Sequence, residues 1–245
     1  MTTYKAEIEF KSFLNEEDLI RLNSETLELL FDPNITQHKL FFKFDCDESG
    51  KDAAANNLMK NYLGILCVYL QCKIEEFRLI SITNVSSPVV TISQYLQMTS
   101  NSMIRLGPLS DTGVERLTAA LNNVQDVNNY DFVLIDMYRM ARAAESNVEA
   151  FWLYYAALLT LVTNPNRDRP EVNSWLINRF PNDTVHNDHF NQNVNIAIAV
   201  RDTLSHVGAT FSGETLNITE SIMRANNQMS IFLREKILSQ LENGL

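Results

Sequence analysis

The chain has 245 residues, of which 45% are hydrophobic and 20% charged, a composition typical of a globular protein that builds a core. Its net charge of −10 argues against broad nucleic-acid affinity, because such binding needs basic surface that displaces counterions from phosphates. No apolar run reaches the roughly 18 to 20 residues of a membrane helix, and the N-terminus has no apolar signal core. The three cysteines lack CxxC spacing. We therefore expect a cytoplasmic protein with reduced thiols and no membrane association.

Residues 1–107 are expected to form an acidic α+β domain of unknown role. Tyr4, Ala6, Ile8 and Phe10 alternate with charged residues, which predicts a strand with one buried face. Asn15, followed by three acidic residues, predicts the start of a helix whose apolar residues include Ile20, Leu22 and Leu27. Further strands are predicted over 38–44, 77–82 and 89–96, and a further helix over 52–72.

From about residue 108 the apolar period becomes helical, which predicts an all-α bundle over 108–245 and a domain boundary near residues 100–112. Residues 175–180 are expected to form at most a short helix, and 181–193 a polar loop. The main helices are predicted over 110–124, over 130–144 and 148–162 (as one long helix or two abutting ones), over 194–207 and over 219–241.

Charge is distributed unevenly between the two halves of the sequence. Residues 1–137 carry 11 Lys and Arg against 19 Asp and Glu, whereas residues 138–245 carry 9 against 11. Any RNA site must therefore be a local basic cluster, and the C-terminal half is the more favourable place for one.

The most informative segment is 201–206, Arg-Asp-Thr-Leu-Ser-His. It combines a permanent cation, Arg201, with His206, whose side chain titrates near neutral pH. An imidazole can move protons while a guanidinium holds a phosphate and the charge that develops on it, so this pair can cleave RNA without a metal. Five positions of an ideal helix turn through about 140°, so the two side chains share a face only if the helix loosens at its end, near Gly208.

This segment resembles the signature of the HEPN superfamily, in which an Arg is usually followed by a polar residue, here Asp202, and then by a His after four to six residues. The aromatic and aliphatic segment Glu149–Leu161 is similar to the helix that precedes the motif in family members. Relatives often place an acidic residue near the end of that helix, where this chain has Leu159 and Thr160. The resemblance covers roughly residues 110–245 and fits an Apea-like HEPN arrangement with an unrelated front domain.

The resemblance implies a homodimeric, metal-independent RNA endonuclease of a defence or toxin kind. Two chains would pair along the motif helices and bring two arginines and two histidines to one cleft. His206 would transfer protons, Arg201 would stabilise the phosphorane charge, and Asp202 would orient Arg201 or the histidine of the second chain. The product would be a 2′,3′-cyclic phosphate, and DNA would be refused because it lacks the 2′-hydroxyl. The N-terminal region would sense a trigger, bind a protein partner or restrain the nuclease.

Other side chains carry weaker indications. Arg167 and Arg169 border a proline-containing loop and could contact an RNA backbone. His186, Asp188 and His189 could ligate a metal but lack an evident fourth ligand, so no metal site is expected, and no glycine-rich loop indicates a nucleotide cofactor. Four aromatic residues could stack on bases but are expected in the core: Trp152, Tyr154, Tyr155 and Trp175.

Two other interpretations stay open. A non-catalytic HEPN scaffold would dimerise and bind nucleotide, RNA or a protein, which the acidic net charge and the absent upstream acid favour. Alternatively, an accessory helical protein would have no role with nucleic acid. In that case Arg201 would pair with Asp202 or Glu149 on a surface, and His206 would cap a helix end.

Overall fold

The computed structural model describes residues 1–13, 20–23, 27–31, 37–85, 90–91, 111–124, 132–162, 168–187, 191–205 and 217–243. Contacts divide the chain into two compact units, one of residues 1–143 with 237–245 and one of residues 144–236. The fold class predicted from the sequence is confirmed at the level of an antiparallel sheet with a helix, followed by a mostly helical region. The boundary predicted near residues 100–112 lies largely in 92–110, outside the described residues, and stays a prediction.

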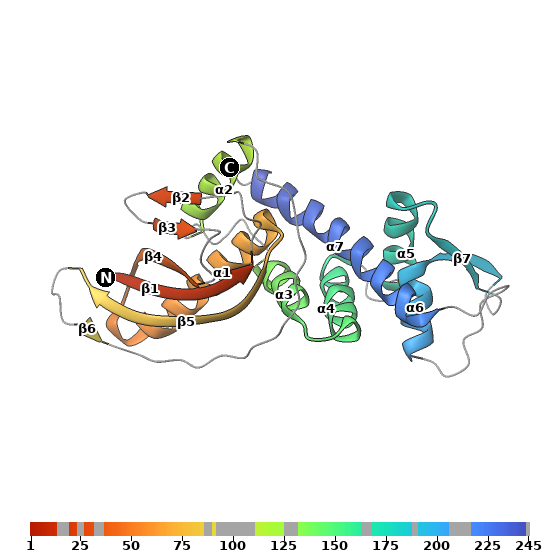
Figure 1. The fold of residues 1–245 in the computed structure, drawn as a ribbon, viewed down its shortest axis with the longest axis horizontal. Coiled ribbons are helices and arrows are strands. Elements are labelled where there is room, and N and C mark those ends of the chain that lie inside the picture. The colour runs from red at the N-terminus through yellow and green to blue at the C-terminus, as the bar shows by residue number, and fades with distance from the viewer. Residues whose placement is uncertain are drawn as a thin grey trace. The chain divides into compact units, whose positions relative to one another are not determined.

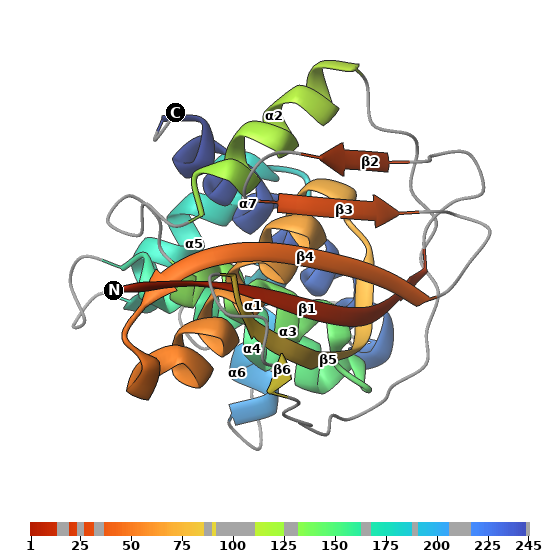
Figure 2. The same cartoon turned by 90° about the vertical axis from the view of Figure 1, so that its left-hand side faces the viewer.

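The first unit is built on an antiparallel sheet with strand order β2-β3-β4-β1-β5-β6 (Figure 2). Tyr4, Ala6, Ile8 and Phe10 are buried on one face of β1, as their alternation with charged residues predicts. β1 lies between β4 and β5, with Ile8 paired with Leu40 and with Leu79. The strands are β1 (Thr2–Phe13), β2 (Ile20–Asn23), β3 (Leu27–Phe31), β4 (Gln37–Cys46), β5 (Lys73–Asn84) and β6 (Val90–Thr91).

Helices pack on this sheet and on each other. After a short 3-10 turn (Glu48–Gly50), α1 (Lys51–Leu70) contacts β5, β1 and β4, and α3 (Phe132–Ala143) packs on α1 and β5. α2 (Asp111–Asn122) also contacts α1. The approach of α1 to α3 is close at Gly64, where an added Cβ would lie 2.5 Å from Cγ2 of Ile135. The predicted helices over 52–72 and 110–124 are thus confirmed.

One element of the first unit differs in type from its prediction. Residues Ile20–Asn23 form strand β2, not part of a helix, and pair with β3 from Ile20↔Phe31 to Asn23↔Glu28. Ile20 and Leu22 alternate with polar residues in the sequence, so a strand partner at β3 outweighs the helical spacing of the leucines. The predicted helix start at Asn15 lies outside the described residues, as does the part of the predicted strand beyond Thr91.

The second unit is mostly helical. Ser146 is the N-cap of α4, and its side chain accepts a hydrogen bond from the backbone N of Glu149 at 3.1 Å. Residues 130–162 therefore hold two helices, not one long helix. The helices are α4 (Asn147–Thr160), α5 (Asp168–Arg179), α6 (Ile196–Ser205) and α7 (Ile218–Asn243), the last of which lies in this unit as far as Lys236.

The second unit also contains a hairpin where the sequence predicts a polar loop. β7 (Thr184–Asn187) pairs with β8 (Gln192–Asn195), and Asn191 in the turn has φ 46°, a left-handed conformation that Asn tolerates better than most residues. The C-terminal region is therefore mostly helical, not all-α. α5 is also longer than the short helix predicted over 175–180, because Pro170 lies in its first turn, where proline is tolerated. No helix in the described ranges is long and apolar enough to cross a membrane.

Candidate functional site

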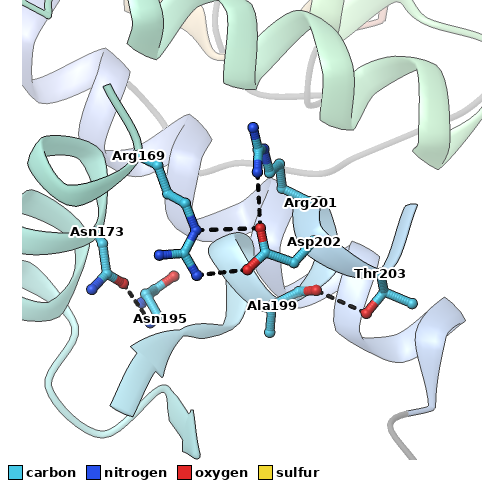
Figure 3. Close-up of polar contacts among 7 residues, drawn as sticks. All are labelled: Arg169, Asn173, Asn195, Ala199, Arg201, Asp202 and Thr203. Carbon is cyan, nitrogen blue, oxygen red and sulfur yellow. Dashed lines mark hydrogen bonds and ion pairs between the residues drawn. The ribbon is translucent and has the colours of Figure 1, made fainter. Parts of the chain in front are cut away.

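Helix α6 carries Arg201 and Asp202, and its start is fixed by Asn195. The side-chain Oδ1 of Asn195 accepts a hydrogen bond from the backbone N of Ala197 at 2.9 Å, the contact of a helix N-cap. The backbone N of Asn195 donates to Oδ1 of Asn173 on α5 at 2.8 Å (Figure 3). The backbone N of Ile196 donates to the carbonyl of Asp183 at 3.0 Å. The first turn of α6 is thus held by α5 and by the segment that leads into β7.

Asp202 is the buried centre of the site. Its side chain accepts from Nε of Arg169 at 3.3 Å and from Nη2 of Arg169 at 2.6 Å, each through a different carboxylate oxygen. It also accepts from Nη1 of Arg201 at 3.0 Å (Figure 3). Asp202 is only 4% exposed, so its charge needs these partners to stay in the interior. One carboxylate therefore organises two guanidinium groups.

Helix α5 contacts α6 at two levels. Arg169 and Asn173 stand one turn apart on α5. Arg169 binds Asp202, in the second half of α6, and Asn173 binds Asn195, which immediately precedes α6. The order is reversed between the helices, because the earlier residue of α5 meets the later residue of α6. This antiparallel arrangement fixes both the position of α6 along α5 and the rotation that aims Arg201.

Arg201 combines a fixed position with access to solvent. Its side chain is 26% exposed, compared with 19% for Arg169 and 6% for Asp202. Within the described part of the chain it makes no hydrogen bond besides the one from Nη1 to Asp202. Its Nε and Nη2 donors are therefore open to an anion, which a planar guanidinium binds well through paired oxygens.

The charges of this cluster affect the pKa of Tyr155, a tyrosine that the sequence places in the core. Tyr155 on α4 is 3% exposed, and its hydroxyl has no hydrogen-bond partner among the described residues. Burial raises the pKa of Tyr155, and nearby charges modulate it: Arg201 and Arg169 lower it, whereas Asp168 and Asp202 raise it. The hydroxyl thus stays protonated at neutral pH.

The structure brings together three of the predicted site residues: Arg201, Asp202 and Arg169. His206 and Arg167 lie outside the described residues, and their roles stay predictions. The pairing of Arg201 with Asp202, which the sequence left open as one inert arrangement, is observed. Glu149, the other partner considered for Arg201, instead accepts a hydrogen bond from the backbone N of Glu145 at 3.1 Å.

The weaker candidates occupy separate places. Nδ1 of His186 lies 3.1 Å from Oδ1 of Asn193 across the β7–β8 hairpin, whereas Asp188 and His189 lie outside the described residues. Over the described ranges, no three His, Cys, Asp or Glu side chains gather in a way that could hold a metal ion. Arg179, which is separated from His186 by six residues in the sequence, pairs with Glu235 through bonds of 3.0 and 2.6 Å.

The aromatic residues expected in the core divide into two groups. Tyr154 and Tyr155 are buried, as predicted, whereas Trp175 is half-buried and stacks on Phe232 with ring centroids 6.0 Å apart. Trp152 is 39% exposed, so its assignment to the core is wrong. It shares one face of α4 with Val148 and Leu159, the other large apolar residues of that helix that are exposed.

No protein-family model, no curated protein and no solved structure matches this chain. The resemblance to the HEPN superfamily therefore stays an expectation carried by residues 201–206 and 149–161. What the site can do follows from its own chemistry: a solvent-accessible arginine and a second arginine, both bound to one buried carboxylate.

Proposed function

We propose that this chain is a metal-independent RNA endonuclease of HEPN type, with Arg201, Asp202 and His206 as its site. The observation that carries the proposal is the buried Asp202, which holds Arg201 in place while leaving two of its nitrogen donors open to a phosphate. A preorganised donor stabilises developing charge better than a mobile one, because no reorganisation is needed during the reaction.

In the proposed reaction, the RNA 2′-oxygen attacks phosphorus and the bond from phosphorus to the 5′-oxygen breaks. One imidazole takes the 2′-hydroxyl proton, and a second, protonated imidazole gives a proton to the leaving 5′-oxygen. His206 from each of two chains would supply these two groups in a composite homodimer site. Arg201 would bind the nonbridging phosphate oxygens as their charge grows.

Asp202 and Arg169 have supporting roles in this proposal. Asp202 orients Arg201, the role that the resemblance implies for it, and its burial prevents it from meeting the anionic substrate directly. Arg169 neutralises Asp202, so the cluster retains the positive charge of Arg201 toward the substrate. The acidic N-terminal unit would sense a trigger or bind a protein partner, in a defence or toxin role.

A second candidate is a non-catalytic HEPN scaffold that binds nucleotide, RNA or a protein partner. The exposed face of α4 favours it, because Val148, Trp152 and Leu159 lie four and seven residues apart and are each more than a third exposed. Aromatic and aliphatic side chains gathered on one helix face are typical of a contact with another helix. A scaffold would bind RNA without changing its length.

Incubation of labelled structured RNA with the protein in EDTA separates these candidates. We expect shortened products that carry 2′,3′-cyclic phosphate ends, and no cutting of a DNA of the same sequence. An RNA with a single 2′-deoxy position at a mapped cut should resist cutting at that position alone. Products with a 5′-phosphate, or cutting of the DNA, would contradict attack by the 2′-oxygen.

A further inference from the structure

Arg169 and Arg201 bind the same carboxylate in different ways. Arg169 reaches both oxygens of Asp202, Oδ1 through Nε at 3.3 Å and Oδ2 through Nη2 at 2.6 Å. Arg201 reaches only Oδ1, through Nη1 at 3.0 Å (Figure 3). The two guanidinium groups therefore share Oδ1, whereas Oδ2 is bound by Arg169.

This division of the oxygens limits how much of Arg201 the carboxylate binds. A guanidinium and a carboxylate favour a bidentate pair, in which two N–H groups donate to the two oxygens. In such a pair Asp202 would occupy two nitrogens of Arg201. Because Arg169 holds Oδ2, Arg201 instead makes a single bond, and its Nε and Nη2 make no bond to Asp202.

Burial makes Asp202 dependent on its cations. Its side chain is 6% exposed, so water can replace a lost partner only poorly. Without Arg169, Arg201 would be the remaining cation bound to Asp202 in the described part of the chain, and both oxygens would turn to it. Two guanidinium groups and one carboxylate leave one positive charge, whereas one of each leaves none. Loss of Arg169 would thus close the donors of Arg201 and neutralise the site.

We propose that Arg169 is a positioning residue that sets the affinity of Arg201 for an RNA phosphate without contacting RNA itself. By holding Oδ2 of Asp202, it keeps two nitrogens of Arg201 available to the phosphate. The inference rests on the proposed function, and it gives Arg169 a different role from the direct backbone contact that the sequence suggests. The side chain of Arg169 is 19% exposed and binds α6, whereas that of Arg201 is 26% exposed.

Removal of the charge of Asp202 distinguishes the two roles of Arg169. Affinity is measured by fluorescence anisotropy with a labelled single-stranded RNA whose 2′-oxygens are methylated, so that they cannot attack phosphorus. We expect Arg169→Gln to weaken binding about tenfold, the effect of losing one hydrogen bond between charged groups. Arg169→Gln combined with Asp202→Asn should bind within about threefold of the wild type, because no carboxylate remains to capture Arg201. A direct contact would leave the double variant as weak as Arg169→Gln.

A matched control checks that this recovery is not a general effect of charge. Glu235 also binds an arginine of the second unit, Arg179, through two hydrogen bonds, so Glu235→Gln likewise removes one negative charge and releases one guanidinium. Arg169→Gln combined with Glu235→Gln should stay about tenfold weaker than the wild type. Arg169→Lys, which keeps the charge of Asp202 compensated but cannot match both oxygens, should also weaken binding. Urea unfolding of each variant shows that the compared proteins are folded.

Four results would overturn the inference: no RNA binding by the wild type, equal affinity of the wild type and the Arg169 variants, no recovery with Asp202→Asn, or equal recovery with Glu235→Gln. Cutting of ordinary RNA is assayed separately. Cutting that needs Arg201, together with RNA affinity that does not depend on Arg169, would leave the nuclease standing and overturn this inference. The expected pattern of affinities without any cutting would do the reverse.

Discussion

Arg169 on α5 donates two hydrogen bonds, of 3.3 and 2.6 Å, to the buried carboxylate of Asp202 on α6. Arg201, which immediately precedes Asp202 in the sequence, donates one hydrogen bond of 3.0 Å to the same carboxylate. The two arginines therefore differ in what they do for the fold. Arg169 compensates the buried charge from a neighbouring helix, whereas Arg201 extends from the same helix toward solvent.

This difference predicts unequal effects of removing each arginine. Arg169→Ala should lower the free energy of unfolding by about 2 kcal/mol, because it leaves a buried carboxylate short of its bidentate partner. Arg201→Ala should cost about 1 kcal/mol or less, because its contact is single and more exposed. Arg169→Lys should be intermediate, since an ammonium cannot match both oxygens. Urea unfolding measures all three, and a larger loss for Arg201→Ala would contradict the assignment.

The cap of α6 gives a second prediction. Asn195→Ala removes the acceptor for the backbone N of Ala197 and should lower the free energy of unfolding by about 1 kcal/mol. RNA cutting should fall with it, because the start of α6 also sets the direction of Arg201. Asn193→Ala is the matched control, since Asn193 is exposed on β8 and its side chain is hydrogen-bonded to His186 and not to α6. Equal stability of the two variants would show that the cap does not fix α6.

The close approach of α1 and α3 gives a third prediction. In an open helix interior, Gly→Ala stabilises by about 0.5–1 kcal/mol. At Gly64 the new methyl would lie 2.5 Å from Cγ2 of Ile135, whose branched side chain is stiff, so a net loss of about 1–3 kcal/mol is expected. Thermal unfolding measures this loss. Gly50→Ala, with nothing within 4 Å of the added Cβ, should show none, and the Gly64→Ala loss should shrink in an Ile135→Ala background.

Buried thiols give a fourth prediction. Burial raises the pKa of Cys67 to about 11 and raises that of Cys72 well above its ordinary value. In the native protein both should resist iodoacetamide, whereas the half-buried Cys46 should react faster. Peptide mass mapping before and after unfolding measures how much of each cysteine is modified. Modification of Cys67 or Cys72 at the rate of Cys46 would contradict their burial.

The same raised pKa values give a pH dependence of stability with a definite sign. Between the ordinary thiol pKa and about 11, the unfolded chain loses the Cys67 proton while the folded chain keeps it. The contribution of this thiol is therefore complete below the unfolded pKa and is lost as the pH rises toward 11. Wild type should lose more stability over this range than Cys67→Ala, as urea midpoints at several pH values would show.

Much of the fold follows from local periodicity. The spacing of the apolar residues alone predicts which face is buried in the strand through residues 4–10 and in the helix over 52–72. Helix α7 begins and ends within a few residues of its predicted bounds. The strand β2 and the β7–β8 hairpin depend on pairing with another segment. Residues 184–187 and 192–195 are mainly polar, so they lack the alternation of apolar and polar residues that would predict strands.

The site is only partly readable from the sequence. Arg201 and Asp202 are adjacent and match a known pattern, whereas Arg169 stands 33 residues before Asp202, and no spacing rule predicts that they meet. Tyr155 occupies a core position of an aromatic helix, and the sequence does not indicate that its buried hydroxyl lacks a hydrogen-bond partner. His206 remains the catalytic base or acid of the proposal on the strength of the motif.

The most direct test is the rate of RNA cleavage in EDTA by the wild type, Arg201→Ala and His206→Ala. Arg179→Ala and His186→Ala serve as matched controls, because they remove an arginine and a histidine of the same unit from other places. The account predicts cutting by the wild type and both controls, with losses of at least about 100-fold for Arg201→Ala and His206→Ala. Equal cutting by all five proteins, or loss of cutting in EDTA by the wild type when it cuts with added metal, would contradict it.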